Sequence, residues 1–200
     1  MDPLCGWCYG FSLVVMKARD EYKDVLEAEV KVGGMIIGPR IAPVSQMSDY
    51  ILQAYKRVED YSGVKFGEPY LDLMRKGTEI NNSEPPCQAI HYFKETHAQQ
   101  GVDFAHETQL KLFRDGKSLN DMNTYKELAT EFGLNEDEFV TGMQTEENRY
   151  HTFQEFQWVQ SAGITGFPCL VLKKDKEFFL ISRGFQPYEG VKEVLEKALK

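Results

Sequence analysis

The pattern that most restricts the fold of this chain is a pair of cysteines, Cys5 and Cys8, at the start of a helical periodicity. Apolar side chains follow at helical spacing through Phe11, Val15 and Ala18, which predicts a helix over residues 5 to 23. Two cysteines three positions apart in the first turn of a helix lie on one face, close enough to bridge. The spacing therefore predicts a reversible short-loop disulfide.

The position of this pair also predicts its chemistry. Cys5 is expected at the helix N-terminus, where unpaired N–H groups and the helix dipole stabilise a thiolate. Cys5 is therefore the expected nucleophile, and Cys8, one turn further in, is expected to resolve the mixed disulfide. Gly6 leaves the turn open to a substrate, and Trp7 adds bulk and an N–H donor.

Three other interpretations of the pair stay open: a passive disulfide, half of a metal site, or two unreactive thiols. A zinc site usually needs a second close pair of ligands. The remaining cysteines, Cys87 and Cys169, are isolated in the sequence, so no metal site is expected. Redox activity is the favoured interpretation.

The rest of the chain predicts an α/β protein with a long helical interruption. Residues 25 to 32 alternate apolar and polar side chains before Gly33 and Gly34, as in a half-buried strand. Helical segments then follow from residue 39 to about 150, one of them with a capped start at Asn135. A hairpin over residues 169–172 and 178–181 and a helix near residues 191–199 close the chain. These patterns divide it into a first domain of residues 1–38 and 150–200 and a helical insertion of residues 39–149.

One element is missing from this order. A dithiol at a helix start normally follows a strand that brings it to a sheet edge, yet only four residues, Met1 to Leu4, precede Cys5. The strand lies upstream of Met1, or a partner supplies it, or the fold does without it. We favour the first of these explanations.

The amino-acid composition excludes some classes of binding partner. The formal net charge is -8 and the pI is near 5.1, whereas nucleic-acid and anionic-membrane binders carry basic surfaces. No apolar run is long enough to span a membrane, and no leader opens the chain. We therefore expect a cytoplasmic protein with protein or small-molecule partners, although an export signal is not excluded if the N-terminus is truncated.

A second motif, Gly163-Ile-Thr-Gly-Phe-Pro-Cys169, runs into the predicted hairpin. Pro168 has no N–H to donate to a sheet ladder, so its place at a strand start needs a reason. The base rate of cis X-Pro bonds is only about 5%, and the sequence alone does not assign a cis bond here.

The two motifs, the helical block between them and the closing hairpin and helix together resemble the DsbA-like thioredoxin family. Within it the chain is most similar to the FrnE-type branch of predicted protein-disulfide isomerases. The resemblance implies a thioredoxin-like fold with a helical insertion and a cis Phe167-Pro168 bond beside the cysteines. It implies that Phe167 docks the substrate and that Pro168 keeps the backbone close to Cys5.

The implied function is thiol-disulfide exchange with protein substrates, by reduction or isomerisation. The reaction is expected to need no cofactor besides the redox pair of Cys5 and Cys8. Exchange of this pair with glutathione is an additional option. Neither a proline nor a histidine stands between the cysteines, and a histidine would help to stabilise the thiolate. This departure from better-known relatives favours a weaker oxidant. Redox direction and oligomeric state are left open.

Two other functions compete with this one. Kappa-class glutathione transferases and hydroxychromene-carboxylate isomerases resemble the same fold, but they typically carry serine where Cys5 stands. The third alternative is a non-catalytic binding module with a vestigial cysteine pair. The intact pair favours exchange.

The remaining titratable residues carry weaker signals. Cys169 is expected to face away from the site, because successive strand side chains alternate. Cys87 follows two prolines at a helix start and is a second candidate thiol, with ordinary packing favoured. The four histidines have no ligand spacing and are expected to be surface or packing residues: His91, His97, His106 and His151.

Overall fold

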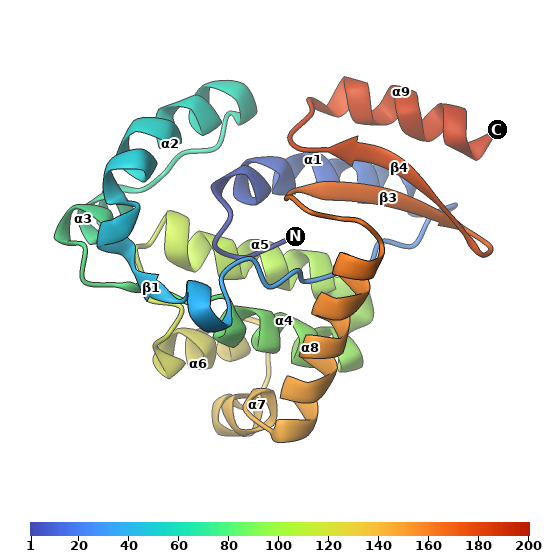
Figure 1. Cartoon of the computed structure of the whole chain (residues 1–200). Coiled ribbons are helices and arrows are strands. Elements are labelled where there is room, and N and C mark those ends of the chain that lie inside the picture. The colour runs from blue at the N-terminus through green and yellow to red at the C-terminus, as the bar shows by residue number, and fades with distance from the viewer.

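The computed structural model describes all residues from Met1 to Lys200, and most of them lie in helices (Figure 1). The α-helices are α1 (Gly6–Tyr22), α2 (Ser48–Ser62), α3 (Glu68–Lys76), α4 (Glu84–Thr96), α5 (Gly101–Phe113), α6 (Met122–Glu131), α7 (Glu136–Met143), α8 (Glu146–Ser161) and α9 (Tyr188–Leu199). Short 3-10 turns are η1 (Gly38–Arg40), η2 (Val44–Gln46) and η3 (Ala98–Gln100). The strands are β1 (Ala42–Pro43), β2 (Ile80–Asn81), β3 (Cys169–Lys174) and β4 (Glu177–Arg183).

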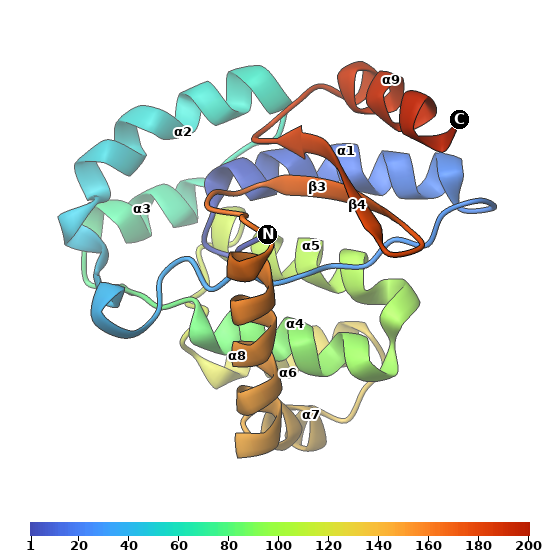
Figure 2. The ribbon, with the colours of Figure 1, turned by 45° about the vertical axis from the view of Figure 1, so that its right-hand side comes forward.

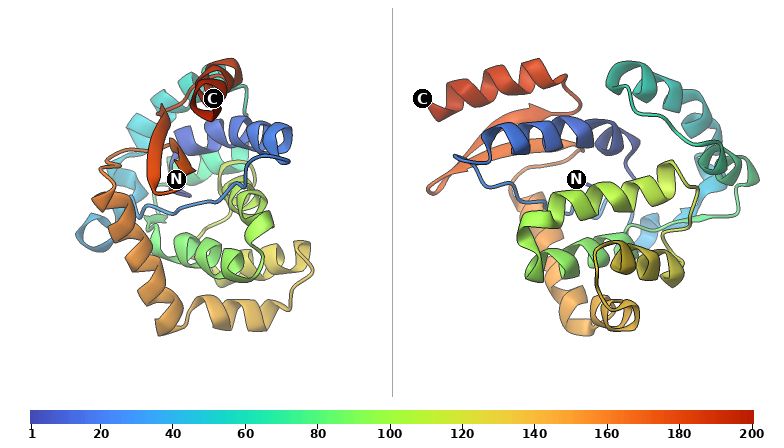
Figure 3. Two further views of the ribbon diagram at one scale, coloured as in Figure 1. Left: turned by 90° about the vertical axis from the view of Figure 1, so that its right-hand side faces the viewer. Right: turned by 180° about the vertical axis from the view of Figure 1, so that it is seen from behind.

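Strands β3 and β4 form the predicted antiparallel hairpin, with an irregularity between Leu170 and Val171. Asp175 turns the chain with a left-handed φ of 57°. Helices α1 and α9 pack with the hairpin (Figure 3). Their shared core contains Phe11 from α1 and Val191 from α9. The hairpin and the closing helix are therefore confirmed.

Helices α4 to α8 enclose a second core. Its fully buried members include Ile90, Tyr125 and Leu128. Side-chain caps fix several helix starts, and Asn135 accepts hydrogen bonds from two backbone nitrogens of α7, as its sequence predicts. The predicted helical block is confirmed, except that β1 and β2 form a two-residue antiparallel pair within it.

A third core attaches helix α1 to the helical block. Tyr9 of α1 lies among aromatic side chains of the block, with its ring centroid 5.5 Å from that of Phe66 and 5.1 Å from that of Phe113. Aromatic pairs at such distances add to the stability gained by burial. The cysteine-bearing end of α1 is thus held by packing against the helical block.

The predicted strand over residues 25–32 is wrong. Residues 26–34 have no regular secondary structure and run between the hairpin and helices α4 and α5 (Figure 2). A strand needs a neighbouring strand to form its ladder, and no strand pairs with this segment. The apolar alternation still has a structural result, because Val32 is fully buried in the core of the helical block.

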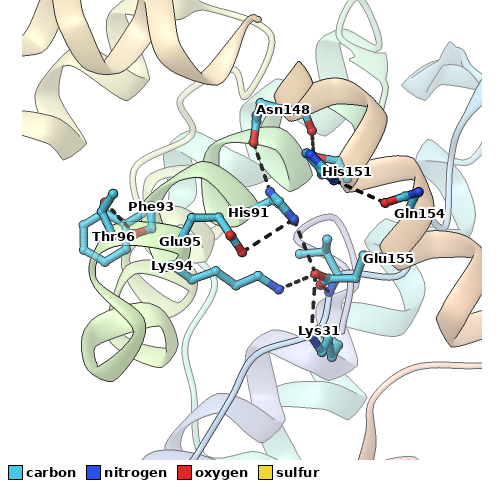
Figure 4. Close-up of polar contacts among 12 residues, drawn as sticks. Lys31, His91, Phe93, Lys94, Glu95, Thr96, Asn148, His151, Gln154 and Glu155 are labelled. Atoms are coloured by element: carbon cyan, nitrogen blue, oxygen red, sulfur yellow. Dashed lines mark hydrogen bonds and ion pairs between the residues drawn. The ribbon is translucent and has the colours of Figure 1, made fainter. Parts of the chain in front are cut away.

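Side chains, rather than neighbouring strands, satisfy the backbone of the extended segment. The Lys94 ammonium donates to the carbonyl of Val30 at 2.9 Å and pairs with the Glu155 carboxylate. Glu155 in turn accepts the backbone N–H of Val32 at 2.5 Å. Figure 4 shows this pair, with His91 and Lys31 also near the carboxylate. The buried ion pair therefore satisfies backbone groups of the extended segment.

Helix α8 crosses residues 149 and 150, where the sequence places the end of the helical insertion. Val32 from the first part of the chain belongs to the core of the helical block. None of the helices combines the length and the apolar composition that crossing a lipid bilayer requires.

Candidate active site

The two N-terminal cysteines lie at the first turn of helix α1. Cys5 is the N-cap residue, and its Sγ accepts a hydrogen bond from the backbone nitrogen of Cys8 at 3.2 Å. The preceding turn is closed by the Cys5 N–H, which donates to the carbonyl of Asp2 at 3.1 Å. Both cysteines are free thiols, 8% and 3% exposed. The Cys5 sulfur thus lies beside the unpaired N–H groups of helix α1, which favours the thiolate form of Cys5.

The environment of the pair shifts the pKa values of the two thiols in opposite directions. A hydrogen bond from the Cys8 side chain lowers the pKa of Cys5, and burial opposes this only in part. Burial raises the pKa of Cys8 well above its ordinary value, and its bond to Cys5 adds to the rise. The site therefore holds a group that ionises readily beside one that keeps its proton, which is the division expected of an attacking and a resolving thiol.

The second sequence motif lies against the cysteines. The Phe167-Pro168 peptide bond is cis, and the Cys5 Sγ lies 3.7 Å from the carbonyl oxygen of Phe167. The Phe167 ring packs on Gly33, where a Cβ atom would lie 2.0 Å from the ring. Because residue 33 has no side chain, the Phe167 ring can pack directly on its backbone. The loop that carries Phe167 therefore lies close to Cys5.

Aromatic side chains surround the two residues between the cysteines. The Trp7 ring lies 5.8 Å from that of Phe185 and 6.2 Å from that of Tyr61, which is 62% exposed. A Cβ atom added at Gly6 would lie 3.5 Å from the Phe66 ring, which is an ordinary contact distance. The cysteines are therefore bordered by an apolar surface that an apolar substrate segment could contact.

Asp2 supports the site, although no sequence pattern singled it out. Its fully buried carboxylate accepts hydrogen bonds from the N–H of Leu4 at 3.0 Å, the N–H of Met35 at 2.6 Å and the hydroxyl of Ser83 at 3.0 Å. Burial raises its pKa. Asp2 thereby ties the cysteine turn to the chain after the extended segment and to the start of helix α4. The Asp-Pro dipeptide marks a turn, but its partners are far away in sequence.

The other candidate residues lie outside this constellation. Cys87 is fully buried, and burial raises its pKa well above the ordinary value, which opposes a second reactive thiol. Cys169 is half-buried, and burial raises its pKa too. His106 packs beside Tyr9 and shares a hydrogen bond with Ser12 at 2.9 Å. No three His, Cys, Asp or Glu side chains are grouped so that they could hold a metal ion.

Comparison with known proteins assigns the fold to one family. The DSBA-like thioredoxin domain matches residues 1–196, and the chain belongs to this family of disulfide oxidoreductase folds. The comparison with curated proteins finds no match.

Solved structures agree with this assignment. One, described as a proposed protein disulfide isomerase from Nitrosomonas europaea, is 25% identical with a TM-score of 0.85, and the match covers 99% of this chain and 94% of that one. The cytosolic disulfide reductase DsbM from Pseudomonas aeruginosa is 25% identical with a TM-score of 0.80, over 99% of this chain and 95% of that one. The same reductase with GSH is 24% identical with a TM-score of 0.78, covering 99% and 96% of the two chains.

Proposed function

We propose that this protein is a thiol-disulfide oxidoreductase that reduces or isomerises disulfides in proteins through Cys5 and Cys8. The observation that carries the proposal is the Cys5 sulfur at the N-cap of helix α1, bonded to the Cys8 nitrogen and 3.7 Å from the Phe167 carbonyl. Membership of the DSBA-like family supports it.

Reduction proceeds by two exchanges. The Cys5 thiolate attacks one sulfur of the substrate disulfide, forms a mixed disulfide and releases the other sulfur as a thiolate, which takes up a proton. Cys8 then loses its proton and attacks the Cys5 sulfur, which releases the second substrate thiolate. The protein dithiol is oxidised by two electrons, and the substrate disulfide is reduced to two thiols.

The substrate segment lies along the loop before Pro168 in this proposal. The Phe167 backbone docks an extended substrate, and Trp7 and Gly6 border its path. The exposed Tyr61 ring beside Trp7 extends the same surface. This arrangement suits a protein substrate with apolar residues near its disulfide.

A reducing role is supported by the residues between the cysteines, because no histidine is present there to stabilise the thiolate further. The cytosolic reductase DsbM is a structural neighbour, and we propose a cytoplasmic location here too. The DsbM structure with GSH supports glutathione as a thiol that re-reduces the pair.

We also retain the proposed division of the chain into a thioredoxin-like part, residues 1–38 and 150–200, and a helical insertion, residues 39–149. The shared packing of Tyr9 and Val32 with the insertion makes the two parts structurally dependent.

Single cysteine variants test the proposal. Cys5→Ser is expected to abolish dithiothreitol-driven reduction of a protein disulfide, and Cys8→Ser is expected to accumulate a mixed disulfide on Cys5, measured by mass spectrometry. Cys169→Ser, which removes a half-buried thiol outside the pair, is the matched control and should retain activity. Full activity in Cys5→Ser would exclude the proposed nucleophile.

A further inference from the structure

The loop before Pro168 is held by packing rather than by backbone hydrogen bonds. No backbone group of residues 165–167 bonds to another backbone group. The Phe167 ring instead lies on Gly33, where three ring carbons are 2.0 to 2.9 Å from the position of an added Cβ atom. Gly33 belongs to the extended segment, which runs between the hairpin and helices α4 and α5 (Figure 2). The position of the loop beside Cys5 therefore depends on where this segment holds Gly33.

Helix α8 fixes the backbone on both sides of Gly33. The N–H of Val32 donates to the Glu155 carboxylate at 2.5 Å. The next residue of the helix, Phe156, lies against Gly34, where an added Cβ atom would be 2.8 Å from the aromatic ring. Two neighbouring residues of one helix thus hold the residues before and after Gly33, and together they define where Gly33 lies.

Lys94 of helix α4 holds the same segment two residues earlier. Its ammonium donates to the carbonyl of Val30 at 2.9 Å and pairs with the Glu155 carboxylate (Figure 4). Backbone groups two residues apart in an extended chain point to the same edge. At this edge the cation meets a carbonyl, and the anion meets the N–H of Val32. The polarity of the pair therefore matches the backbone that it holds.

The pair is separate from the groups that bond to the nucleophile. The hydrogen bonds of the Cys5 sulfur involve Cys8 and the Phe167 carbonyl, not the pair. The Lys94 and Glu155 side chains are 5% and 6% exposed, and a buried ion pair is by itself weak evidence for a stabilising role. Directional hydrogen bonds from buried charges do restrict the position of their partners. The pair is thus suited to fixing the backbone under the Phe167 ring.

We propose that Lys94 and Glu155 are positioning residues for thiol-disulfide exchange, an inference that rests on the proposed function. They hold the extended segment so that Gly33 receives the Phe167 ring and the Phe167 carbonyl stays beside the Cys5 sulfur. Loss of either residue displaces the backbone on which a protein substrate docks, whereas Cys5 keeps its environment at the helix start. Exchange with protein disulfides therefore depends on the pair, and exchange with small disulfides does not.

Three variants test the proposal. Lys94→Met removes the donor to Val30, and Glu155→Gln keeps an acceptor for Val32 while it removes the charge. Met74→Ala is the matched control, because it opens a cavity in the separate core that attaches helix α1 to the helical block and so lowers stability. All variants are assayed where circular dichroism shows them folded, and Glu155→Gln carries the test if Lys94→Met does not fold.

The rates are measured with insulin, which contains protein disulfides, and with hydroxyethyl disulfide, which is a small one, with dithiothreitol as the reductant. Both pair variants are expected to raise KM for insulin at least about fivefold while kcat changes less than about twofold. Reduction of hydroxyethyl disulfide by the same variants should stay within about twofold of the parent rate. Met74→Ala should leave the kinetics with both substrates unchanged.

Nuclear Overhauser contacts between the α-protons of Gly33 and the Phe167 ring report the packing independently of turnover. These contacts should weaken in both pair variants and persist in Met74→Ala. Unchanged contacts in the pair variants, equal losses with insulin and hydroxyethyl disulfide, or the same rise of KM in Met74→Ala would each overturn the proposal. Failure of the proposed function is seen separately, because the parent chain would then reduce neither disulfide.

Discussion

The Cys5 sulfur caps helix α1 by accepting a hydrogen bond from the backbone nitrogen of Cys8 at 3.2 Å. The capping atom is thus also the proposed nucleophile. A thiolate accepts such a bond better than a thiol does, so ionisation of Cys5 and stability of the helix start are coupled. Cys8, buried one turn further in, has no such advantage.

The two thiols should therefore react at different pH. The pKa of Cys5 is lowered, so its thiolate persists at pH values below those of an ordinary cysteine, whereas the raised pKa of Cys8 keeps that thiol protonated. We expect iodoacetamide at neutral pH to modify Cys5 at least about tenfold faster than Cys8. Mass spectrometry of the alkylated peptides between pH 5 and pH 9 measures both rates. Equal rates for Cys5 and Cys8 would contradict the assignment of roles.

Gly33 should be intolerant of a side chain. A Cβ atom there would lie 2.0 Å from the Phe167 ring, so Gly33→Ala displaces the loop beside Cys5. We expect a loss of about 1–3 kcal/mol in unfolding free energy and slower disulfide reduction. Gly166→Ala, in the same loop with no atom within 4 Å of the new Cβ, is the control and should change neither. A Gly33→Ala protein with unchanged stability and rate would show that the contact with Phe167 is dispensable.

Asp2 should contribute to stability through the groups that donate hydrogen bonds to its buried carboxylate. Asp2→Ala leaves the N–H of Met35 and the hydroxyl of Ser83 without their acceptor, at a cost of about 1–3 kcal/mol for each buried group. Ser83→Ala removes one donor and leaves the carboxylate, so a smaller loss is expected. Urea unfolding of both variants gives the comparison, and an Asp2→Ala loss no greater than that of Ser83→Ala would refute the role of Asp2 as the shared acceptor.

The Lys94–Glu155 pair should be far more important than a surface pair. Both side chains are almost fully buried, so Lys94→Met removes the buried charge partner of the Glu155 carboxylate, at a cost of about 3–5 kcal/mol. The matched variant Lys126→Met breaks an ion pair with the exposed Asp137, and we expect a loss below about 1 kcal/mol. Chemical denaturation measures both, and similar losses would mean that burial of the pair has no energetic consequence.

Local patterns predicted much of this fold. The helical periodicity after Cys5, the cap at Asn135 and the alternation in the hairpin are each encoded within a few residues, and the structure has all of them. The expected strand over residues 25–32 failed because a strand depends on neighbours that a short window does not contain. Its alternation was real, but it placed Val32 in a helical core.

The residues of the site also divide into those that the sequence predicts and those that it does not. The spacing of Cys5 and Cys8 is a local pattern, and it predicted the redox pair. The role of the loop at Pro168 was predicted from a family resemblance. The roles of Asp2 and Gly33 were not predicted, because they depend on Ser83 and Phe167, which lie 81 and 134 positions away in the sequence. Contacts of that range arise only when the chain is folded.

The central claim is that Cys5 and Cys8 form a working redox pair, and the most direct test is its equilibrium reduction potential. Trp7 fluorescence in glutathione or dithiothreitol buffers reports the transition, with Cys8→Ser as the control. We predict one reversible two-electron transition nearer to that of thioredoxin, about -270 mV, than to that of DsbA, about -120 mV. The absence of a reversible transition, or one that persists unchanged in Cys8→Ser, would contradict the claim.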